Sequence, residues 1–256
     1  MKKVMAININ DLGGISDHLM DHKYHNCNRN YIDWKYWAEQ VDKSATWNAF
    51  KDYILKKKPD ILVIQEMLVS RYENIDFISE LDDLGYTYLK GCLPENDGNY
   101  SLTITFYNRD CDAPEYLNFP NDSRRYRSVV SKLGNLIICG SHFPPESDLV
   151  FLKRMYQFVL SYQDKNFLLI GDLNASNPTM GNWQLISNLL KKGFIDLWTA
   201  AGNDEHTPTE AQYGGRLDLA IASPSLAKKV EHIEIDSTPM KYGITDHSAV
   251  IVDIKD

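Results

Sequence analysis

The sequence lacks several features that would assign a protein to a class at once. Its 256 residues contain only four cysteines, which are far apart and form no C-x-x-C pair, so neither a disulfide framework nor a four-cysteine zinc site is expected. No apolar run approaches the ~18 residues that span a membrane, and there is no internal repeat or low-complexity tract. The expectation that remains is an ordinary globular protein without a membrane span.

Basic residues are also in short supply. The chain has 27 lysines and arginines against 35 acidic residues, a net charge of −8, whereas a generic nucleic-acid binder leans the other way. This argues only mildly against a nucleic-acid substrate, because a local basic strip can coexist with an acidic whole. Lys2 and Lys3 precede an apolar stretch that Asn8 interrupts, too short for a signal-peptide core. We expect a cytoplasmic protein with no obligate protein partner.

Strand-like runs alternate with amphipathic segments from end to end, which predicts α/β layers in a single domain over residues 1–256. Apolar spacing predicts helices around residues 47–55, 149–160 and 183–190, the second with Ser147 as its cap and the third ended by Gly193. Strands are expected at Leu102–Tyr107 and Arg127–Leu133. Gly134 and Asn135 have the composition of a hairpin turn into a strand at Leu136–Gly140.

Several of the apolar runs have polar residues at their ends, and these residues are suited to metal or phosphate. In four segments the polar residues follow the strand, and in the last two they lead into it. The segments are Val4–Asn10, Ile61–Glu66, Leu136–His142, Phe167–Asn174, Arg216–Ala222 and Ile244–Val252. Such a group at the rim of a β core is costly unless a cation or a substrate completes it.

Two of these segments offer oxygen ligands. Glu66 suits Mg²⁺ or Mn²⁺, and Asn8 and Asn10 can add carbonyl ligands or orient a phosphate; the alternative is that each only caps a strand end. Asp172 and Asn174 are two positions apart, which on a strand puts both on one face. There the aspartate would orient or deprotonate a water and the asparagine would hold a phosphoryl oxygen, with Gly171 leaving room for close approach.

The histidines suggest acid–base chemistry. Asp218 and His247 can pair, which fixes the tautomer of the imidazole and leaves its second nitrogen for water or phosphate. Asp246 points elsewhere and is a second candidate metal ligand. His142 leaves its strand into a stiff Phe-Pro-Pro segment and can donate a proton to a leaving alkoxide. The alternative for each histidine is a structural role.

Taken in order, these segments resemble the endonuclease/exonuclease/phosphatase superfamily along nearly the whole chain. The family's N-x-N, Q-E, G-D-x-N, R-[IL]-D and [ST]-D-H motifs have five counterparts, which are Asn8–Asn10, Gln65–Glu66, Gly171–Asn174, Arg216–Asp218 and Thr245–His247. Position 142 separates subfamilies: the exonuclease III group has tyrosine there, whereas His142 resembles deoxyribonuclease-like members.

The resemblance implies a four-layer α/β sandwich in which two packed, mixed or mostly antiparallel sheets are flanked by helices. It implies a Mg²⁺- or Mn²⁺-dependent hydrolase of phosphate esters. The metal ligands would be Glu66, with Asn8, Asn10 and Asp246 nearby, and the catalytic residues His142, Asp172, Asn174, Asp218 and His247. A phosphodiesterase acting on DNA or RNA is favoured. A phosphatase or a phospholipid or sphingomyelin-type phosphodiesterase is the alternative, and outside enzymes a degenerate binding module.

Two further segments leave their role open. Arg125 and Arg127 belong to the only dense basic strip, and alternation along a strand would let both bind substrate phosphates; a solvated strand edge explains them equally well. Residues 11–46 form an insertion relative to compact family members. Its His18, His22, His25 and Cys27 hint at zinc without a paired second half, and its aromatic residues Tyr31, Trp34 and Trp37 suit a substrate lid or simple packing.

Overall fold

Two mixed β-sheets organise the chain in a computed structural model, which describes residues 1–14, 42–67, 75–93, 102–119, 125–145, 147–211 and 214–255. Each sheet has six strands, in the orders β11-β12-β1-β2-β4-β3 and β5-β6-β7-β8-β10-β9. In each, one central pair is parallel (β1 with β2, β7 with β8) and the other neighbours are antiparallel. The first sheet comprises β1 (Lys2–Asn8), β2 (Ile61–Met67), β3 (Tyr86–Tyr88), β4 (Leu102–Asn108), β11 (Val230–Asp236) and β12 (Ala249–Ile254). The second comprises β5 (Glu115–Leu117), β6 (Ser128–Leu133), β7 (Leu136–Ser141), β8 (Asn166–Asp172), β9 (Ile195–Asp196) and β10 (Asp218–Ala222).

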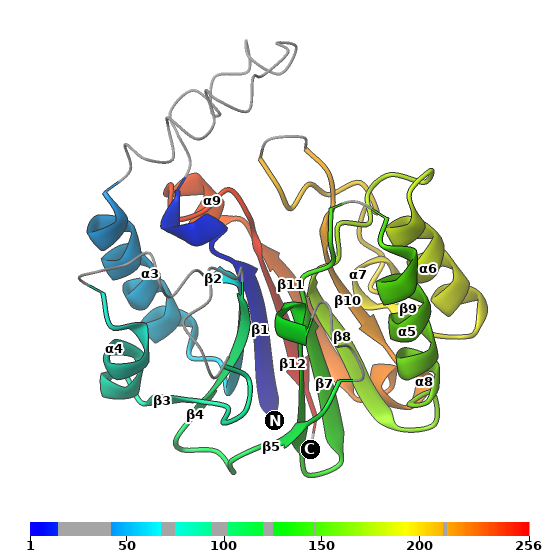
Figure 1. Cartoon of the computed structure of the whole chain (residues 1–256), viewed down its shortest axis with the longest axis horizontal. Coiled ribbons are helices and arrows are strands. Elements are labelled where there is room, and N and C mark those ends of the chain that lie inside the picture. Colours follow the sequence, from blue (N-terminus) through cyan, green and yellow to red (C-terminus); the bar gives the residue numbers. More distant parts are fainter. Residues whose placement is uncertain are drawn as a thin grey trace.

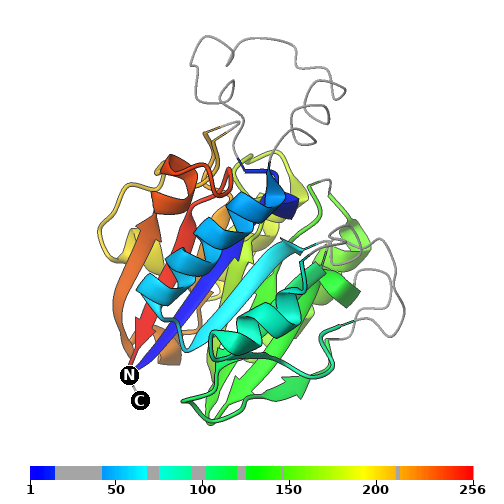
Figure 2. The same ribbon diagram turned by 90° about the vertical axis from the view of Figure 1, so that its left-hand side faces the viewer.

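Helices cover the outer faces of both sheets (Figures 1 and 2). The parallel pairs require crossovers, which α3 (Lys43–Lys57) supplies between β1 and β2, and α5 (Leu149–Leu160) between β7 and β8. Within the described ranges the further helices are α4 (Phe77–Asp83), α6 (Gly181–Lys191), α7 (Leu197–Ala200), α8 (Pro224–Ala227) and α9 (Thr238–Lys241), with 3-10 turns η1 (Asn10–Leu12) and η4 (Arg125–Arg127). This arrangement confirms the predicted four-layer α/β sandwich.

Strand alternation divides the buried side chains into three cores. Met5 and Ile7 of β1 face Phe50 and the outer helices, whereas Val4 and Ala6 face the other sheet. A third core lies between the second sheet and α5 and α6, where Leu169 meets buried side chains of both helices. Burial on both faces explains why the central strands read as continuous apolar runs rather than as alternating ones.

The helix caps and the exposed helix faces correct details of the sequence analysis. The N-cap of α5 is Asp148, whose carboxylate accepts from the backbone N–H of Phe151; Ser147, the predicted cap, instead accepts from the N–H of Gly181 and ties α6 to α5. Four residues at the ends of the helix ranges predicted from apolar spacing are exposed: Leu55, Leu149, Trp183 and Leu190. In each case the real apolar stripe is carried by neighbouring residues that the same spacing also allowed.

Residues 15–41, most of the predicted insertion, lie outside the described residues, and so do its histidines, Cys27 and the three aromatic residues. The insertion as predicted overlaps α3, because the helix already begins at Lys43 with Asp42 as its cap. Among the described residues, no helix has the length and apolarity needed to cross a membrane. Cys92, Cys111 and Cys139 are free thiols, as the absence of a disulfide pattern predicted.

Candidate active site

The parallel strand pairs explain why the predicted site residues converge. Parallel strands bring their carboxyl ends to the same edge of a sheet, so β1 and β2 deliver Asn8 and Glu66 together, and β7 and β8 do the same for His142 and Asp172. The two sheets pack with these edges at the same end of the sandwich. Both termini lie at the opposite end (Figure 1).

The closest group of potential ligands consists of Glu66, His142 and Asp172. Each offers one atom that lies within 4.8 Å of the other two. The Nε2 atom of His142 is 3.5 Å from Oε1 of Glu66 and 3.6 Å from Oδ2 of Asp172. His142 and Asp172 are buried while Glu66 is partly exposed, so the group is open on one side.

Asn8 and Asn10 differ in what they face. The amide of Asn8 is buried and donates to Oδ2 of Asp172 over 3.0 Å, and its Oδ1 accepts from the backbone N–H of Asn10 over 2.9 Å. The side-chain amide of Asn10 donates to the carbonyl of Gly14. Asn8 therefore positions Asp172, and Asn10 shapes the turn that leaves β1.

The predicted Asp218–His247 pair is present. Nδ1 of His247 lies 2.8 Å from Oδ2 of Asp218, and both side chains are buried. Asp218 is the cross-strand neighbour of Asp172 in the β8–β10 ladder. The Thr209 hydroxyl fixes the start of β10 by accepting from the N–H groups of Leu217 and Asp218. The second ring nitrogen of His247 lies 3.9 Å from Oδ1 of Asp246.

Burial dominates the electrostatics of the two inner aspartates. It raises the pKa of Asp172 to about 8, where the cationic influence of His247 opposes the carboxylates of Asp218 and Glu66. It likewise raises the pKa of Asp246 to about 7, with His247 lowering it and the carboxylates of Glu210 and Glu66 raising it. Several buried carboxyl groups thus lie close together with few cationic groups to balance them, as expected of a site that binds a cation.

The two histidines are shifted in opposite directions. Burial lowers the pKa of His142 well below its usual value, and the nearby charges of Arg127 and His247 lower it further. Burial also acts to lower the pKa of His247, but the carboxylates of Asp218, Asp246 and Asp172 outweigh it and raise the pKa well above the usual value. Burial therefore favours the neutral form of His142, whereas the surrounding carboxylates favour the charged form of His247.

The arginines are placed differently from the prediction. Arg125 and Arg127 lie in the 3-10 turn η4, so the expected strand alternation does not apply, and the Arg125 side chain is outside the described part. Nη1 of Arg127 lies 3.2 Å from both ring nitrogens of His142, at the border of the acidic group. Arg216 of the R-L-D motif forms a two-pronged ion pair with Asp196, the cap of α7.

Asn174 and Gly171 frame the end of β8. The strand ends at Asp172, so the expected placement of Asn174 on the same strand face is wrong. Its N–H donates to Oδ1 of Asp172 and its amide donates to the carbonyl of Phe143, which joins the β7 and β8 exits. Gly171 provides the expected room: a Cβ there would lie 2.3 Å from the carbonyl oxygen of Ser141 and 2.7 Å from Nε2 of Gln65.

The sequence analysis missed Glu210. It is 3% exposed and forms a β-bridge with His247, while the adjacent Ala211 N–H donates to the carbonyl of Asp246. It thereby adds a carboxyl group beside Asp246. No local pattern marked it, since its segment has no strand or helix period; only the pairing with the Asp246–His247 segment brings it in.

The family of the chain follows from comparison with known proteins. The model of the Endonuclease/Exonuclease/phosphatase family matches residues 25–247. The chain belongs to this family. None of the curated proteins matches it by sequence, and the assignment to the histidine-type, deoxyribonuclease-like subclass stays a prediction.

Several solved structures have the same fold as this chain at low sequence identity. An AP endonuclease from Archaeoglobus fulgidus has a TM-score of 0.69 and 15% identity over 100% of both chains. A variant of the 3′ phosphatase NExo from Neisseria, bound to a product DNA hairpin, has a TM-score of 0.68 and 15% identity, again over 100% of both chains. The 3′-5′ exonuclease NExo from Neisseria meningitidis has a TM-score of 0.66 and 16% identity, over 99% of this chain and 100% of that one. At sequence identities this low, the similarity establishes a shared fold and nothing more.

Proposed function

We propose that this family member is a divalent-metal-dependent phosphodiester hydrolase that acts on nucleic acid. The observation that carries the proposal is the meeting of Glu66, His142 and Asp172 within 4.8 Å, beside a His247–Asp218 pair held at 2.8 Å. Oxygen and imidazole ligands, an oriented second imidazole and a nearby arginine are the groups that hydrolysis of a phosphate ester uses.

The donor set fits Mg²⁺ or Mn²⁺. Glu66 would hold the ion together with His142 and Asp172. The Glu66 carboxylate raises the pKa of Asp246, so the predicted ligand Asp246 would add negative charge around the ion. Asn8 and Asn10, expected as carbonyl ligands, would instead act by fixing Asp172 and the exit of β1. The bound ion would neutralise charge on the phosphoryl and leaving oxygens.

The remaining chemistry falls to the chain's own side chains. A water oxygen attacks phosphorus in line as the opposite P–O ester bond breaks. The raised pKa of Asp172 would fall beside a bound cation, so that this carboxylate, held by Asn8 and the Asn174 N–H, could take the water proton. His247, which Asp218 orients through Nδ1 and whose pKa the nearby carboxylates raise, would donate from Nε2 to a phosphate oxygen. His142, expected to protonate the leaving oxygen, would instead bind the ion or donate a hydrogen bond as a neutral imidazole, because burial lowers its pKa. The guanidinium of Arg127 at its edge offers a contact to a nonbridging phosphate oxygen.

Two proteins of similar structure support a nucleic-acid substrate, since one is an AP endonuclease and the other a 3′-5′ exonuclease. A second candidate is a phosphate monoester at a nucleic-acid 3′ end, because the same fold serves a 3′ phosphatase bound to a DNA hairpin. Phospholipid and sphingomyelin head groups remain the alternative within the fold. The cytoplasmic compartment, the single domain over residues 1–256 and the absence of an obligate protein partner stay predictions.

The test is hydrolysis of bis-p-nitrophenyl phosphate with Mn²⁺ or Mg²⁺, before and after EDTA. We expect turnover that EDTA abolishes and that Glu66→Gln and His247→Asn each reduce by roughly a hundredfold or more. His232→Asn, an exposed histidine on β11, is the matched control and should retain activity. Absence of metal-dependent turnover in the folded wild-type protein would favour the binding module.

A substrate panel with Mn²⁺ then separates the candidates. Nicked or shortened plasmid, oligonucleotide or RNA supports the nuclease. Release of inorganic phosphate from a 3′-phosphorylated oligonucleotide without chain cleavage supports the phosphatase. Cleavage of sphingomyelin vesicles beside intact nucleic acid would overturn the nucleic-acid assignment.

A further inference from the structure

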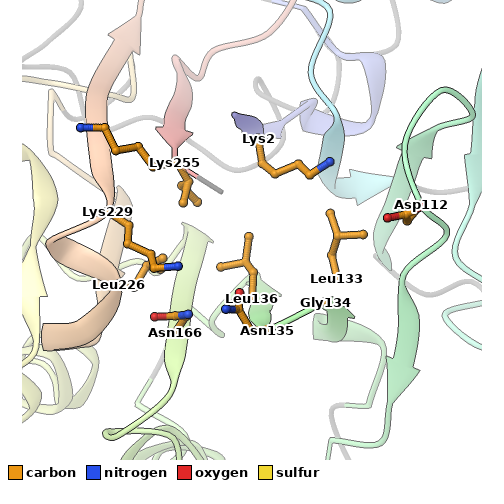
Figure 3. A pocket seen from close by; sticks show the side chains of 11 residues that line it. Lys2, Asp112, Leu133, Gly134, Asn135, Leu136, Asn166, Leu226, Lys229 and Lys255 are labelled. Carbon is orange, nitrogen blue, oxygen red and sulfur yellow. The ribbon is translucent and has the colours of Figure 1, made fainter.

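A cavity of about 180 Å³ lies at the pole of the sandwich opposite the candidate active site. Its walls come from the β6–β7 hairpin, the first residues of β1 and β8, the α8 region and the end of β12. These are the amino ends of the parallel strands, whereas the active site lies at their carboxyl ends. Figure 3 shows the side chains around it.

The floor of this cavity is apolar. Leu133, Leu136 and Leu226 line it together with Ile254, and all four are buried members of the core between the sheets. The amides of Asn135 and Asn166 stand at its edge. A ligand seated here would therefore cover a hydrocarbon surface while meeting hydrogen-bond donors at the rim, which is the usual composition of a small-molecule site.

The rim is basic although the whole chain carries a net charge of −8. Among the described residues that line the cavity, Lys2, Lys229 and Lys255 are basic and Asp112 is acidic. Lys255 is directed away in Figure 3 and pairs with Glu231 at 3.1 Å. Lys2 and Lys229 are half-buried, and neither ammonium forms a hydrogen bond or ion pair with another described residue. Two cations that no described residue pairs with, placed beside an apolar floor, attract an anion.

We propose that this cavity binds a small organic anion, a carboxylate carried on a short aliphatic or aromatic body. Its apolar body would contact Leu133 and Leu136, and its carboxylate would accept from Lys229 and the Asn166 amide. The volume is below the ~300–1,000 Å³ of sites for drug-sized ligands but far above the ~10–15 Å³ that holds one water. A nucleic-acid strand does not fit, so the site is separate from the proposed nuclease activity.

The experiment uses benzoate as the probe and isothermal titration calorimetry on the full chain. Wild type should bind benzoate saturably, and Lys229→Gln should weaken binding by roughly tenfold or more, because a charge-assisted hydrogen bond is lost. Lys228→Gln is the matched control: Lys228 is the neighbouring residue, exposed, and does not line the cavity. Lys2→Gln should weaken binding in the same direction as Lys229→Gln.

Two analogues decide the ligand class. Benzyl alcohol lacks the charge and inorganic phosphate lacks the apolar body, so both should bind at least about fivefold more weakly than benzoate. Equal binding of either analogue, equal effects of Lys228→Gln and Lys229→Gln, or no saturable binding of benzoate would overturn the proposal. Metal-dependent hydrolysis by Lys229→Gln should equal that of wild type, so failure of this site leaves the proposed function untouched.

Discussion

Three residues at the rim of the candidate active site hold backbone conformations that few non-glycine residues adopt. Asn10, Glu66 and Asn174 have φ values of 46°, 54° and 46°, each where the chain leaves a central strand. Left-handed conformations cost of order 1 kcal/mol or more for residues with a Cβ and cluster at functional sites. The positive φ angles of these residues turn the chain at the strand ends, and this places their side chains at the rim of the site.

Asp218→Asn tests whether the buried pair acts in catalysis. Asparagine keeps the shape but removes the charge beside Nδ1 of His247 and allows the wrong tautomer, so we expect kcat/KM for metal-dependent hydrolysis to fall by roughly 10²–10⁴-fold. Stabilisation by Mn²⁺, measured as the shift in Tm, should persist, because Asp218 lies outside the Glu66–His142–Asp172 group. An unchanged kcat/KM would contradict the assigned role.

Gly171→Ala tests the close packing around the end of β8, where Ser141 of the neighbouring strand and Gln65 of the other sheet both come near. Gly171 has φ +133°, and a Cβ would lie 2.3 Å from a backbone oxygen; together these should cost about 3 kcal/mol or more of unfolding free energy. The control is Gly202→Ala, with φ +83° and nothing within 4 Å of its added Cβ, where only about 1 kcal/mol is expected. Urea denaturation measures both, and equal losses would contradict the steric explanation.

The decisive elements are the two parallel strand pairs. β1 and β2 in one sheet, and β7 and β8 in the other, are each joined through a covering helix, α3 or α5. The helices also tie distant parts together: the end of α3 reaches β11 through Lys57, whose Nζ lies 2.8 Å from Asp236 and 2.9 Å from Glu234. Tyr53 of the same helix donates to Asp236 over 2.9 Å.

This contact predicts a pH dependence of stability. Burial would raise the pKa of Asp236, but hydrogen bonds from Lys57, Thr238 and Tyr53 outweigh it and lower the pKa to about 2. Because the folded pKa lies below the unfolded value of ~3.9, the stabilisation is complete above pH ~4 and is lost as the pH falls towards 2. Asp236→Asn should therefore cost about 1–2 kcal/mol at pH 7 and progressively less below pH 4.

Chemical denaturation at pH 7 and pH 3 measures this difference. Glu115→Gln is the control, because Glu115 pairs with Lys132 across 3.6 Å on an exposed edge and should change stability by less than about 0.5 kcal/mol at either pH. A cost of Asp236→Asn that stays constant from pH 7 to pH 3 would show that the carboxylate charge is not what stabilises this contact.

At the scale of the whole molecule, the packing of the two sheets assembles the site. Neither sheet alone contains it, since Glu66 and Asn8 belong to one and Asp172 and Asp218 to the other. The Asn8–Asp172 hydrogen bond crosses between them. A ligand that contacts both sheets should therefore raise the free energy of unfolding of the whole chain.

Mn²⁺ at about a hundred times its Kd should add roughly 2.7 kcal/mol to the unfolding free energy, a rise in Tm of about 5–10 °C for a chain of this size. EDTA should reverse the rise and Glu66→Gln should abolish most of it, because the variant loses the open, charged ligand of the group. Glu231→Gln, at the opposite pole, should respond as wild type does. A rise of the same size in Glu66→Gln would place the ion elsewhere.

The sequence by itself determined the layers, the strand ends and most of the site. Continuous apolar runs followed by polar residues predicted Asn8, Glu66, His142 and Asp172 at one rim, and motif spacing supplied Asp218 and His247. These features are local or periodic, so they can be predicted from the sequence. The helix caps were harder to predict, as Ser147 and Asp148 show, because two adjacent residues can each supply the oxygen that caps the helix.

Only the tertiary structure decided which atoms meet. It brought His142 rather than Asn10 beside Glu66, placed Arg127 against that imidazole, and added Glu210 next to Asp246. It also turned Asn174 away from the face of β8 and opened a basic cavity at the far pole. Contacts of this kind depend on the packing of two sheets and on irregular turns, and neither leaves a period in the sequence.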